Sequence, residues 1–230
     1  MFDLKEHKNI YMVGIGGISM SGLAHILVSW GFNVSGSNNE SSKVVEELIE
    51  SGINVYIGHD YNNINESYDL VVYTAAVKED NPELVHAKEL NIPIMERGLF
   101  LGELTKLFKD TIGVAGTHGK TTTTSMVSEC FLAENTDPTI QVGSILKSIN
   151  GNYRVGKSDY FIIEACEYCD SYLNFKQKSA IILNIDNDHM DYFKTLCIPT
   201  TLKLILSTYC LFLYKSYVGY PISSNTIFLA

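Results

Sequence analysis

Apolar and polar segments alternate regularly along the first half of the chain. Short apolar runs with the composition of buried strands lie at residues 9–15, 32–36, 54–57, 69–74 and 92–95. Segments with apolar residues at helical spacing lie between or after them, at 20–30, 43–50, 82–90 and 99–108. Alternation of strands and helices is typical of an α/β fold with a parallel sheet. We therefore predict a Rossmann-like, parallel-sheet domain over residues 1–108.

A second α/β pattern begins directly after this domain. A strand at 111–115 runs into a glycine-bearing loop, and a helix is expected at 120–133. Two later apolar runs, at 159–164 and 179–185, have the character of strands that end in polar or acidic residues. The carboxyl ends of parallel strands are where ligands bind in such folds. Residues 109–194 are therefore predicted to form part of an α/β domain with a phosphate-binding loop.

The character of the sequence changes after residue 194. All 26 acidic residues lie at or before that point, whereas residues 195–230 contain only the charges of Lys203 and Lys215. We interpret 195–230 as a divergent tail, such as a reading-frame change near codon 195 would produce. Its uncharged run at 204–214 is shorter than the roughly 20 residues that a membrane span needs. The N-terminus also lacks the apolar core of a signal peptide, so we expect a cytoplasmic protein without a membrane partner.

Charge and cysteine content narrow the functional classes. The formal net charge of −9 and the pI of about 5.1 provide no basic field for nucleic acid, so no such partner is expected. An anionic ligand would need local cations or a metal. The five cysteines have no regular spacing, which argues against a disulfide framework. Cys166 and Cys169 form a C-x-x-C pair that could be redox-active or half of a zinc site, but no second pair accompanies it.

The first glycine-rich loop follows the first predicted strand. Its sequence, Gly14-Ile-Gly16-Gly17-Ile-Ser19, precedes a helix, and glycines at such a place let the backbone approach a diphosphate at the positive end of the helix. Ser19 replaces the third glycine of the dinucleotide fingerprint, and no acid follows the second strand to hold a ribose hydroxyl. A ligand with a diphosphate other than NAD is therefore favoured.

The second glycine-bearing loop has a more specific pattern. It contains Gly116, Thr117, His118, Gly119, Lys120, Thr121 and Thr122. Val114 occupies the place of the first glycine in the strict Walker pattern. The loop still has amides to wrap phosphate, a lysine to reach the β and γ phosphates, and the Thr121 hydroxyl for Mg²⁺. A nucleotide triphosphate site is the interpretation, with a plain glycine-rich turn as the alternative.

Acidic residues follow both later strands of this second pattern. Glu164 ends one strand and Glu167 follows three residues later, so at least one of these carboxylates is expected beside the phosphate loop, where the magnesium of a nucleotide needs an oxygen ligand. The alternative for Glu164 is a solvated strand end. After the other strand come Asp186, Asp188 and His189, which could hold a metal. His189 could equally cap a helix or face solvent.

Taken in order, these motifs resemble the Mur ligases. The similarity rests on Val13–Gly22, Val34–Ser37, Thr74–Val77 with Asn81–Glu83, Gly116–Thr122 and Asn184–His189. Within the family, the two loops are most similar to those of the member that adds L-alanine. Family members have a Rossmann-like domain for the UDP-sugar, a second domain for ATP and a third that closes over the amino acid. That third domain and the adenine-binding asparagines of the family have no counterpart in this sequence.

The resemblance implies an ATP-dependent ligase of peptidoglycan precursor synthesis, with UDP-N-acetylmuramate and L-alanine as substrates. The residues expected to line the UDP-sugar site are Gly14, Gly16, Gly17, Ser19, Ser37, Thr74, Ala75 and Ala76. Lys120 and Thr121 would serve ATP and Mg²⁺, Glu164 would bind a first magnesium, and His189 a second. Lys120, Glu164 and His189 are the expected catalytic residues. Ser19 and Asn38 stand where the family more commonly has glycine and aspartate.

Three alternatives remain at this stage. A sister ligase attaches a ready-made tripeptide to the same UDP-sugar and has similar first domains. A UDP-sugar-binding chain without catalysis would need only the first domain. A generic P-loop kinase or ATPase would explain the second loop but would leave the first domain without a purpose.

Overall fold

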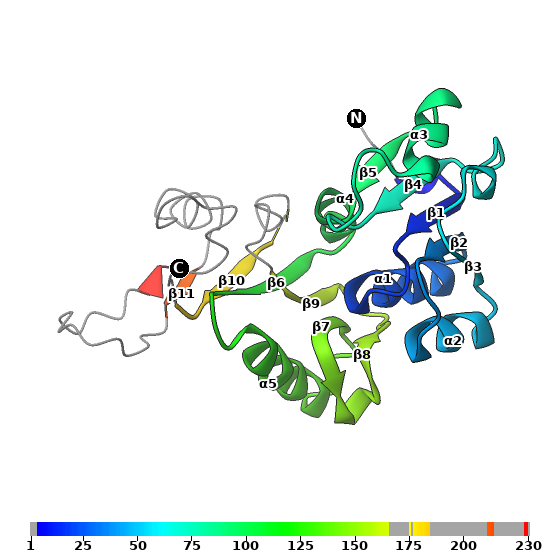
Figure 1. Cartoon of the computed structure of the whole chain (residues 1–230). Coiled ribbons are helices and arrows are strands. Elements are labelled where there is room, and N and C mark those ends of the chain that lie inside the picture. The colour runs from blue at the N-terminus through cyan, green and yellow to red at the C-terminus, as the bar shows by residue number, and fades with distance from the viewer. Residues whose placement is uncertain (1–3, 166–174, 176, 185–210, 214–227, 230) are drawn as a thin grey trace. The chain divides into compact units, whose positions relative to one another are not determined.

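The computed structural model describes residues 4–165, 175, 177–184, 211–213 and 228–229 (Figure 1). The chain divides into two compact units, Met1–Phe100 and Leu101–Ala230, and each is described by itself below. The division falls inside helix α4 (Arg97–Thr105), which follows the last strand of the first unit without a loop.

The first unit is built on a five-stranded sheet. Its strand order is β3-β2-β1-β4-β5, and every neighbouring pair is parallel. The strands are β1 (Asn9–Val13), β2 (Asn33–Asn38), β3 (Asn54–Ile57), β4 (Leu70–Tyr73) and β5 (Ile94–Glu96). This order places the topological switch between β1 and β4, where ligands bind in open α/β sheets. The predicted Rossmann-like parallel sheet is confirmed.

The central strands carry the core of the first unit. Ile10, Tyr11, Met12 and Val13 of β1 are all fully buried, as are the first three residues of β4. A parallel strand covered on both faces has no solvent side, which explains the continuous apolar runs in the sequence. Among these buried side chains, Tyr11 alone carries a polar group, its phenol hydroxyl, into the core.

Besides α4, the helices of the first unit are α1 (Ile18–Ser29), α2 (Lys43–Glu50) and α3 (Pro82–Glu89). Both α2 and α3 begin at side-chain caps. The Ser42 side chain accepts a hydrogen bond from the main chain of α2, and the Asn81 side chain does so for α3, where Pro82 occupies the first turn. The predicted cap at Asn81 and Pro82 is confirmed. The first and fourth helices begin two residues earlier than predicted, and the fourth ends at Thr105 rather than residue 108.

The described part of the second unit contains a mixed sheet. Its order is β12-β11-β10-β6-β9-β7-β8, with antiparallel pairs only at its two ends, β7–β8 and β11–β12. The central strands are β6 (Asp110–Ala115), β9 (Tyr160–Glu164) and β10 (Ser179–Ile182), and helix α5 (Lys120–Ala133) follows β6. These four elements were predicted.

Two strands of this sheet were not predicted. Strands β7 (Thr139–Leu146) and β8 (Gly151–Arg154) are joined by a short 3₁₀ turn, and Asn150 adopts a left-handed conformation there with φ 49°. The first half of β7 is buried beside β9, but residues 143–145 are exposed. Since burial changes along the strand, its sequence has no uniform periodicity.

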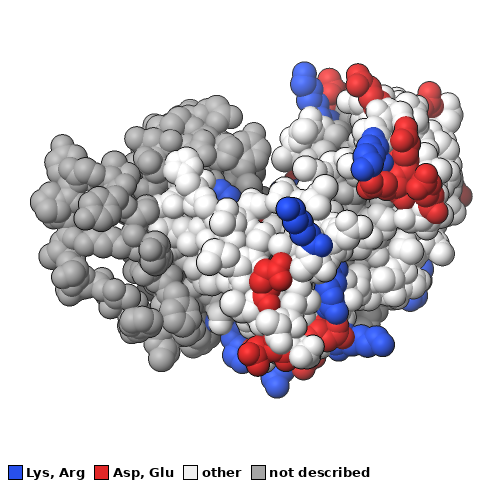
Figure 2. All heavy atoms as spheres, turned by 90° about the horizontal axis from the view of Figure 1, so that it is seen from below, with Lys and Arg blue, Asp and Glu red and all other residues white. Residues whose placement is uncertain are grey.

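The predicted tail lies largely outside the described residues. Only β11 (Leu211–Leu213) and β12 (Phe228–Leu229) are described there, as backbone pairs that extend the sheet from β10. Among the described residues, no helix has the length and apolar character to cross a membrane. On the face drawn in Figure 2, the basic and acidic side chains of the described residues are interspersed.

Candidate functional site

The glycine loop (Gly14–Ser19) joins the carboxyl end of β1 to helix α1. The amides of Gly14 and Ile15 both donate to the carbonyl of Ser37 at the end of β2, at 2.8 and 3.0 Å. The Gly17 amide donates back to the Gly14 carbonyl, and Gly17 begins α1 without a side-chain cap. The loop is therefore fixed by its neighbouring strand, and the uncapped start of a helix lies at its end.

At two of these glycines, a side chain would clash with its neighbours. A Cβ on Gly14 would lie 2.7 Å from the Thr74 side chain, and Gly14 also has a φ of +79°. A Cβ on Gly16 would lie 2.8 Å from the Asn38 side chain, whose oxygen accepts from the Gly16 amide. The structure thus brings the loop against the ends of β2 and β4. Ala75 and Ala76, which follow Thr74, are exposed at the same edge.

A cation beside this loop was missed by the sequence analysis. The Arg97 guanidinium, at the start of α4, donates to the Ser19 hydroxyl over 3.3 Å. Arg97 follows β5, so it reaches α1 across the carboxyl edge of the sheet. A cation directly after a parallel strand, in a chain that needs local positive charge, is the signal that could have identified it.

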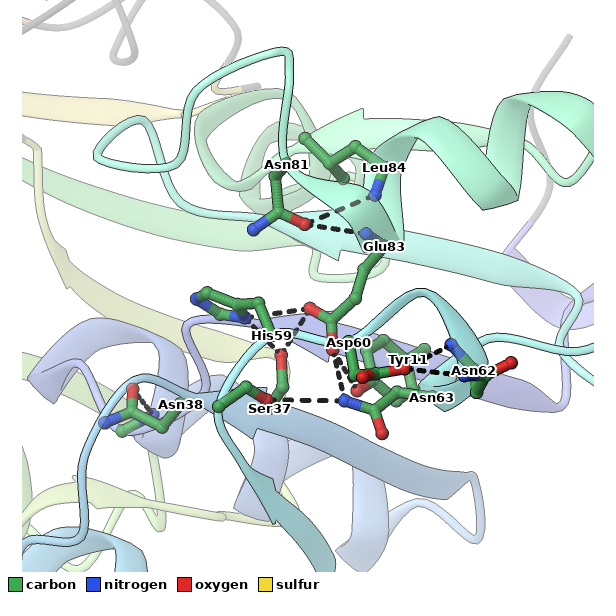
Figure 3. Close-up of polar contacts among 12 residues, drawn as sticks. Tyr11, Ser37, Asn38, His59, Asp60, Asn62, Asn63, Asn81, Glu83 and Leu84 are labelled. Atoms are coloured by element: carbon green, nitrogen blue, oxygen red, sulfur yellow. Dashed lines mark hydrogen bonds and ion pairs between the residues drawn. The ribbon is translucent and has the colours of Figure 1, made fainter.

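A buried polar cluster surrounds Glu83 and includes Ser37, whose carbonyl accepts from the glycine loop (Figure 3). The fully buried Ser37 hydroxyl donates to the carboxylate of Glu83, and the same carboxylate contacts His59, Tyr11 and Asn63. Burial, and then the nearby Glu83 charge, raises the pKa of the Tyr11 phenol well above its usual value. Of this cluster, Ser37 is the residue that was predicted to belong to the site, and its carbonyl holds the glycine loop.

The phosphate loop (Gly116–Thr122) joins β6 to α5 in the second unit. Gly116 has a φ of +140°, and a Cβ there would lie 3.0 Å from the side chain of Leu183. Gly119 caps α5 with a left-handed backbone at φ +83°. The ammonium group of Lys120 donates to the carbonyls of Gly116 and Thr117, at 2.6 and 3.1 Å. The lysine therefore lies along its own loop.

Glu164 lies against the start of α5, as its place at a strand end predicted. One of its carboxylate oxygens accepts from the Thr121 hydroxyl at 2.9 Å, and the other accepts from the Gly143 amide at 2.7 Å. A hydroxyl and a carboxylate at a phosphate loop are oxygen ligands of the kind that Mg²⁺ takes along with nucleotide phosphates. Among the described residues, no cluster of three His, Cys, Asp or Glu side chains could hold a metal by itself. The oxygens of Thr121 and Glu164 by themselves fit a magnesium that shares its ligands with phosphate.

Asn184 fastens the phosphate loop to the end of β10. Its side-chain oxygen accepts from the His118 amide and its side-chain nitrogen donates to the His118 carbonyl, both at 2.8 Å. The Asn184 carbonyl also accepts from the Thr117 amide at 3.3 Å. Of the predicted motif at 184–191 this is the only described residue, and Asp186, Asp188 and His189 lie outside the described residues.

Cys130 is an exposed free thiol on α5, whereas Cys166 and Cys169 lie outside the described residues.

Comparisons with known proteins agree with both units. Residues 9–109 match the Mur ligase family, catalytic domain, and residues 114–198 match the Mur ligase middle domain. The UDP-N-acetylmuramate–L-alanine ligase of Clostridium acetobutylicum is 56% identical over 197 residues, which are 85% of this chain and 43% of that protein. The ligase of the same name from Clostridium beijerinckii is 54% identical over 189 residues, 82% of this chain and 41% of that protein.

Solved structures show the same relationship. The UDP-N-acetylmuramate-alanine ligase of Thermotoga maritima has a TM-score of 0.82 at 32% identity, covering 89% of this chain and 48% of its own. The UDP-N-acetylmuramate:L-alanyl-γ-D-glutamyl-meso-diaminopimelate ligase of Neisseria meningitides has a TM-score of 0.80 at 28% identity, covering 87% and 68%. The chain belongs to the Mur ligase family, whose members are ATP-dependent ligases. It spans less than half the length of the curated relatives that it matches.

Proposed function

We propose that the chain provides the UDP-sugar and ATP sites of a UDP-N-acetylmuramate–L-alanine ligase. The observation that carries this proposal is the contact between Thr121 and Glu164 beside the phosphate loop. A hydroxyl and a carboxylate meet there at the start of a helix that also presents Lys120, and this combination of groups serves phosphoryl transfer from ATP. Relatives more than half identical in sequence carry that ligase name.

In the proposed reaction, an oxygen of the lactyl carboxylate of UDP-N-acetylmuramate attacks the γ-phosphorus of ATP. ADP leaves and an acyl phosphate forms. The amine of L-alanine then attacks the acyl carbon, phosphate leaves, and the amine loses a proton as the amide forms. Carboxylate and triphosphate are both anions, so the reaction needs fixed positive charge.

The phosphate loop supplies part of that charge and the shape of the ATP site. Residues 116–122 would wrap the phosphates with main-chain amides, and Lys120 would exchange its two loop carbonyls for the β and γ phosphate oxygens. Thr121 and Glu164 would hold Mg²⁺, which neutralises developing charge on the transferring group when bound. His189 remains our proposed ligand of a second magnesium.

The glycine loop and its neighbours would bind the UDP-sugar. The start of α1 offers main-chain amides to the diphosphate, and Arg97 beside Ser19 adds a cation to a chain with a net charge of −9. Thr74, Ala75 and Ala76 would lie along the same edge. Ser37 would support the loop from behind through its carbonyl, because its side chain is fully buried. A cytoplasmic location belongs to the same proposal.

Binding measurements on the chain test both sites. Titration calorimetry with ATP and Mg²⁺ should show binding to the wild type and a loss of at least about tenfold in affinity in Lys120→Ala. Lys147→Ala, an exposed lysine of the same unit, is the control and should bind like the wild type. Equal ATP affinity in Lys120→Ala and the control would contradict the assigned role of Lys120.

The tripeptide-adding sister ligase is the second candidate. It is favoured by the TM-score of 0.80 with the Neisseria enzyme, close to the 0.82 of the Thermotoga enzyme. The two are separated by the substrate consumed: a full-length protein that contains this sequence should form ADP with UDP-N-acetylmuramate and L-alanine, and not with the tripeptide. ADP formation that depends on the tripeptide would reverse the choice.

A further inference from the structure

Glu83 is a fully buried acid at the start of α3. Its carboxylate contacts four side chains from separate parts of the first unit. The Tyr11 hydroxyl and the side-chain NH₂ group of Asn63 both donate to Oε1 at 2.8 Å. The Ser37 hydroxyl donates to Oε2 at 2.6 Å. His59 Nδ1 lies 2.9 Å from Oε2. Such complete pairing is what permits a buried carboxylate to exist in a core.

The position of the Glu83 carboxylate is fixed by the helix that carries it. The amide of Glu83 donates to the Asn81 side chain, which caps α3. The carboxylate lies in the first turn, where the helix dipole favours a negative charge. Glu83 is therefore a fixed anchor for two segments of the first unit. It binds Ser37 near the end of β2 and His59, which follows β3.

The anchor acts on the glycine loop through Ser37. The Ser37 hydroxyl is bonded to Glu83, while its carbonyl accepts the amides of Gly14 and Ile15. The place of the glycine loop therefore depends on where Glu83 holds the end of β2. None of the four side chains in contact with the carboxylate needs to touch a ligand for this effect.

The anchor also selects the form of His59. A carboxylate only accepts hydrogen bonds, so the His59 Nδ1 beside Oε2 must carry a proton. The Ser37 hydroxyl lies 2.9 Å from the same nitrogen and already donates to Glu83, so it does not compete for that role. The ring is thereby held with Nε2 directed away from the carboxylate (Figure 3). The His59 side chain is 13% exposed, so the ring is not sealed inside the core.

We propose that Glu83 is a positioning residue for the UDP-sugar site, which holds the glycine loop through Ser37 and fixes the orientation and tautomer of His59. The inference rests on the proposed function, because it assigns a role in the same site. Glu83 itself makes no contact with the ligand.

The variant Glu83→Gln separates positioning from packing. Glutamine keeps the shape of the side chain, but it replaces one carboxylate oxygen with an NH₂ group. That group is a hydrogen-bond donor and would face the donors that now contact the carboxylate. The arrangement with the least conflict puts that group beside Ser37 and His59, because a hydroxyl and a neutral imidazole can both turn into acceptors. His59 would then change from the Nδ1-H to the Nε2-H tautomer. The matched control is Glu89→Gln, which makes the same change of charge at an exposed position of the same helix.

The experiment measures three quantities on the full 230-residue chain. Calorimetry gives the affinities for UDP-N-acetylmuramate and, separately, for ATP with Mg²⁺. The ¹⁵N chemical shifts of the His59 ring report its tautomer. We expect Glu83→Gln to bind the UDP-sugar at least tenfold more weakly, to bind ATP like the wild type, and to show the Nε2-H tautomer. The Glu89→Gln control should match the wild type in all three.

Two results would overturn the inference while leaving the proposed function intact. One is UDP-sugar affinity in Glu83→Gln within twofold of the wild type, and the other is weakened affinity with an unchanged His59 tautomer. If the circular dichroism of Glu83→Gln shows unfolding, Ser37→Ala serves in its place. It keeps three partners on the carboxylate, and normal UDP-sugar affinity in that variant would also overturn the inference. A wild-type chain that binds ATP but no UDP-sugar would instead overturn the proposed role of the first unit.

Discussion

Replacing Tyr11 by phenylalanine removes a single buried hydroxyl from the first unit and leaves the ring in place. The hydroxyl donates to Glu83 Oε1, and both side chains are fully buried. A hydrogen bond to a charged group contributes about 1.5–3 kcal/mol to stability. The carboxylate keeps its contacts with Ser37, His59 and Asn63, so it is not left unpaired. We therefore expect a loss at the lower end, about 1.5–2 kcal/mol.

The assay uses the only tryptophan of the chain. Trp30 lies in the first unit, directly after α1, so its fluorescence follows the unfolding of that unit. A loss of 1.5–2 kcal/mol is a change of roughly 12- to 30-fold in the unfolding equilibrium. With a urea dependence of about 1–3 kcal/mol per molar, the midpoint should fall by roughly 0.5–2 M.

The control is a tyrosine whose hydroxyl also donates to a glutamate of α3. Tyr61 donates to Glu89, but both residues are exposed. Exposed polar pairs exchange readily with water, so Tyr61→Phe should move the midpoint much less. Equal shifts in the two variants, or a Tyr11→Phe midpoint within error of the wild type, would refute the claim that the buried carboxylate depends on its partners.

Three further changes have defined expectations. Gly36→Ala would place a Cβ 2.3 Å from the main-chain oxygen of Met12, so we expect a loss of at least about 2 kcal/mol in the Trp30 assay, and a stable variant would contradict that packing. Asn184→Ala removes both side-chain bonds to the phosphate loop and should weaken ATP binding by about tenfold, whereas unchanged calorimetric affinity would show that the loop holds its shape without them. The hydrogen bond from the main-chain amide of Asn9 is the largest cause that lowers the pKa of Asp69 from 3.8. The Asp69 carboxylate therefore contributes to folding stability above pH 3.8, and this contribution is lost as the pH falls through the lower pKa of the folded state. Urea midpoints of Asp69→Asn should accordingly fall below the wild type at pH 7 and approach it near pH 2, and a constant difference would argue against this assignment.

Local features of the sequence were sufficient for most elements of the fold. Runs of apolar residues predicted the central strands, because parallel strands covered on both faces show no alternation of apolar and polar residues. The Asn81 and Pro82 pair identified the start of α3 from chemistry that involves only neighbouring residues. The contact of Glu164 with the phosphate loop was also foreseeable, since carboxyl ends of parallel strands meet at one edge.

The element boundaries and the edge of the second sheet were harder to predict from the sequence. Helix α4 follows β5 directly, so no turn residues mark its beginning at Arg97. Strand β7 is buried at residues 139–142, exposed at 143–145 and buried again at Leu146, which leaves a sequence without a constant period. The turn that leads into β8 ends at the left-handed Asn150, and a single asparagine is a weak local signal.

By itself, the sequence determined the two α/β patterns, the two glycine-bearing loops and the acid at the end of β9, because each is encoded by residues close together in the chain. Only the tertiary structure decided which polar groups face inward. Glu83 has the sequence of an ordinary first-turn acid, and its burial follows from the meeting of Tyr11, Ser37, His59 and Asn63 around it. A carboxylate can be buried only where donors converge, and that convergence is a property of distant strands rather than of neighbouring residues.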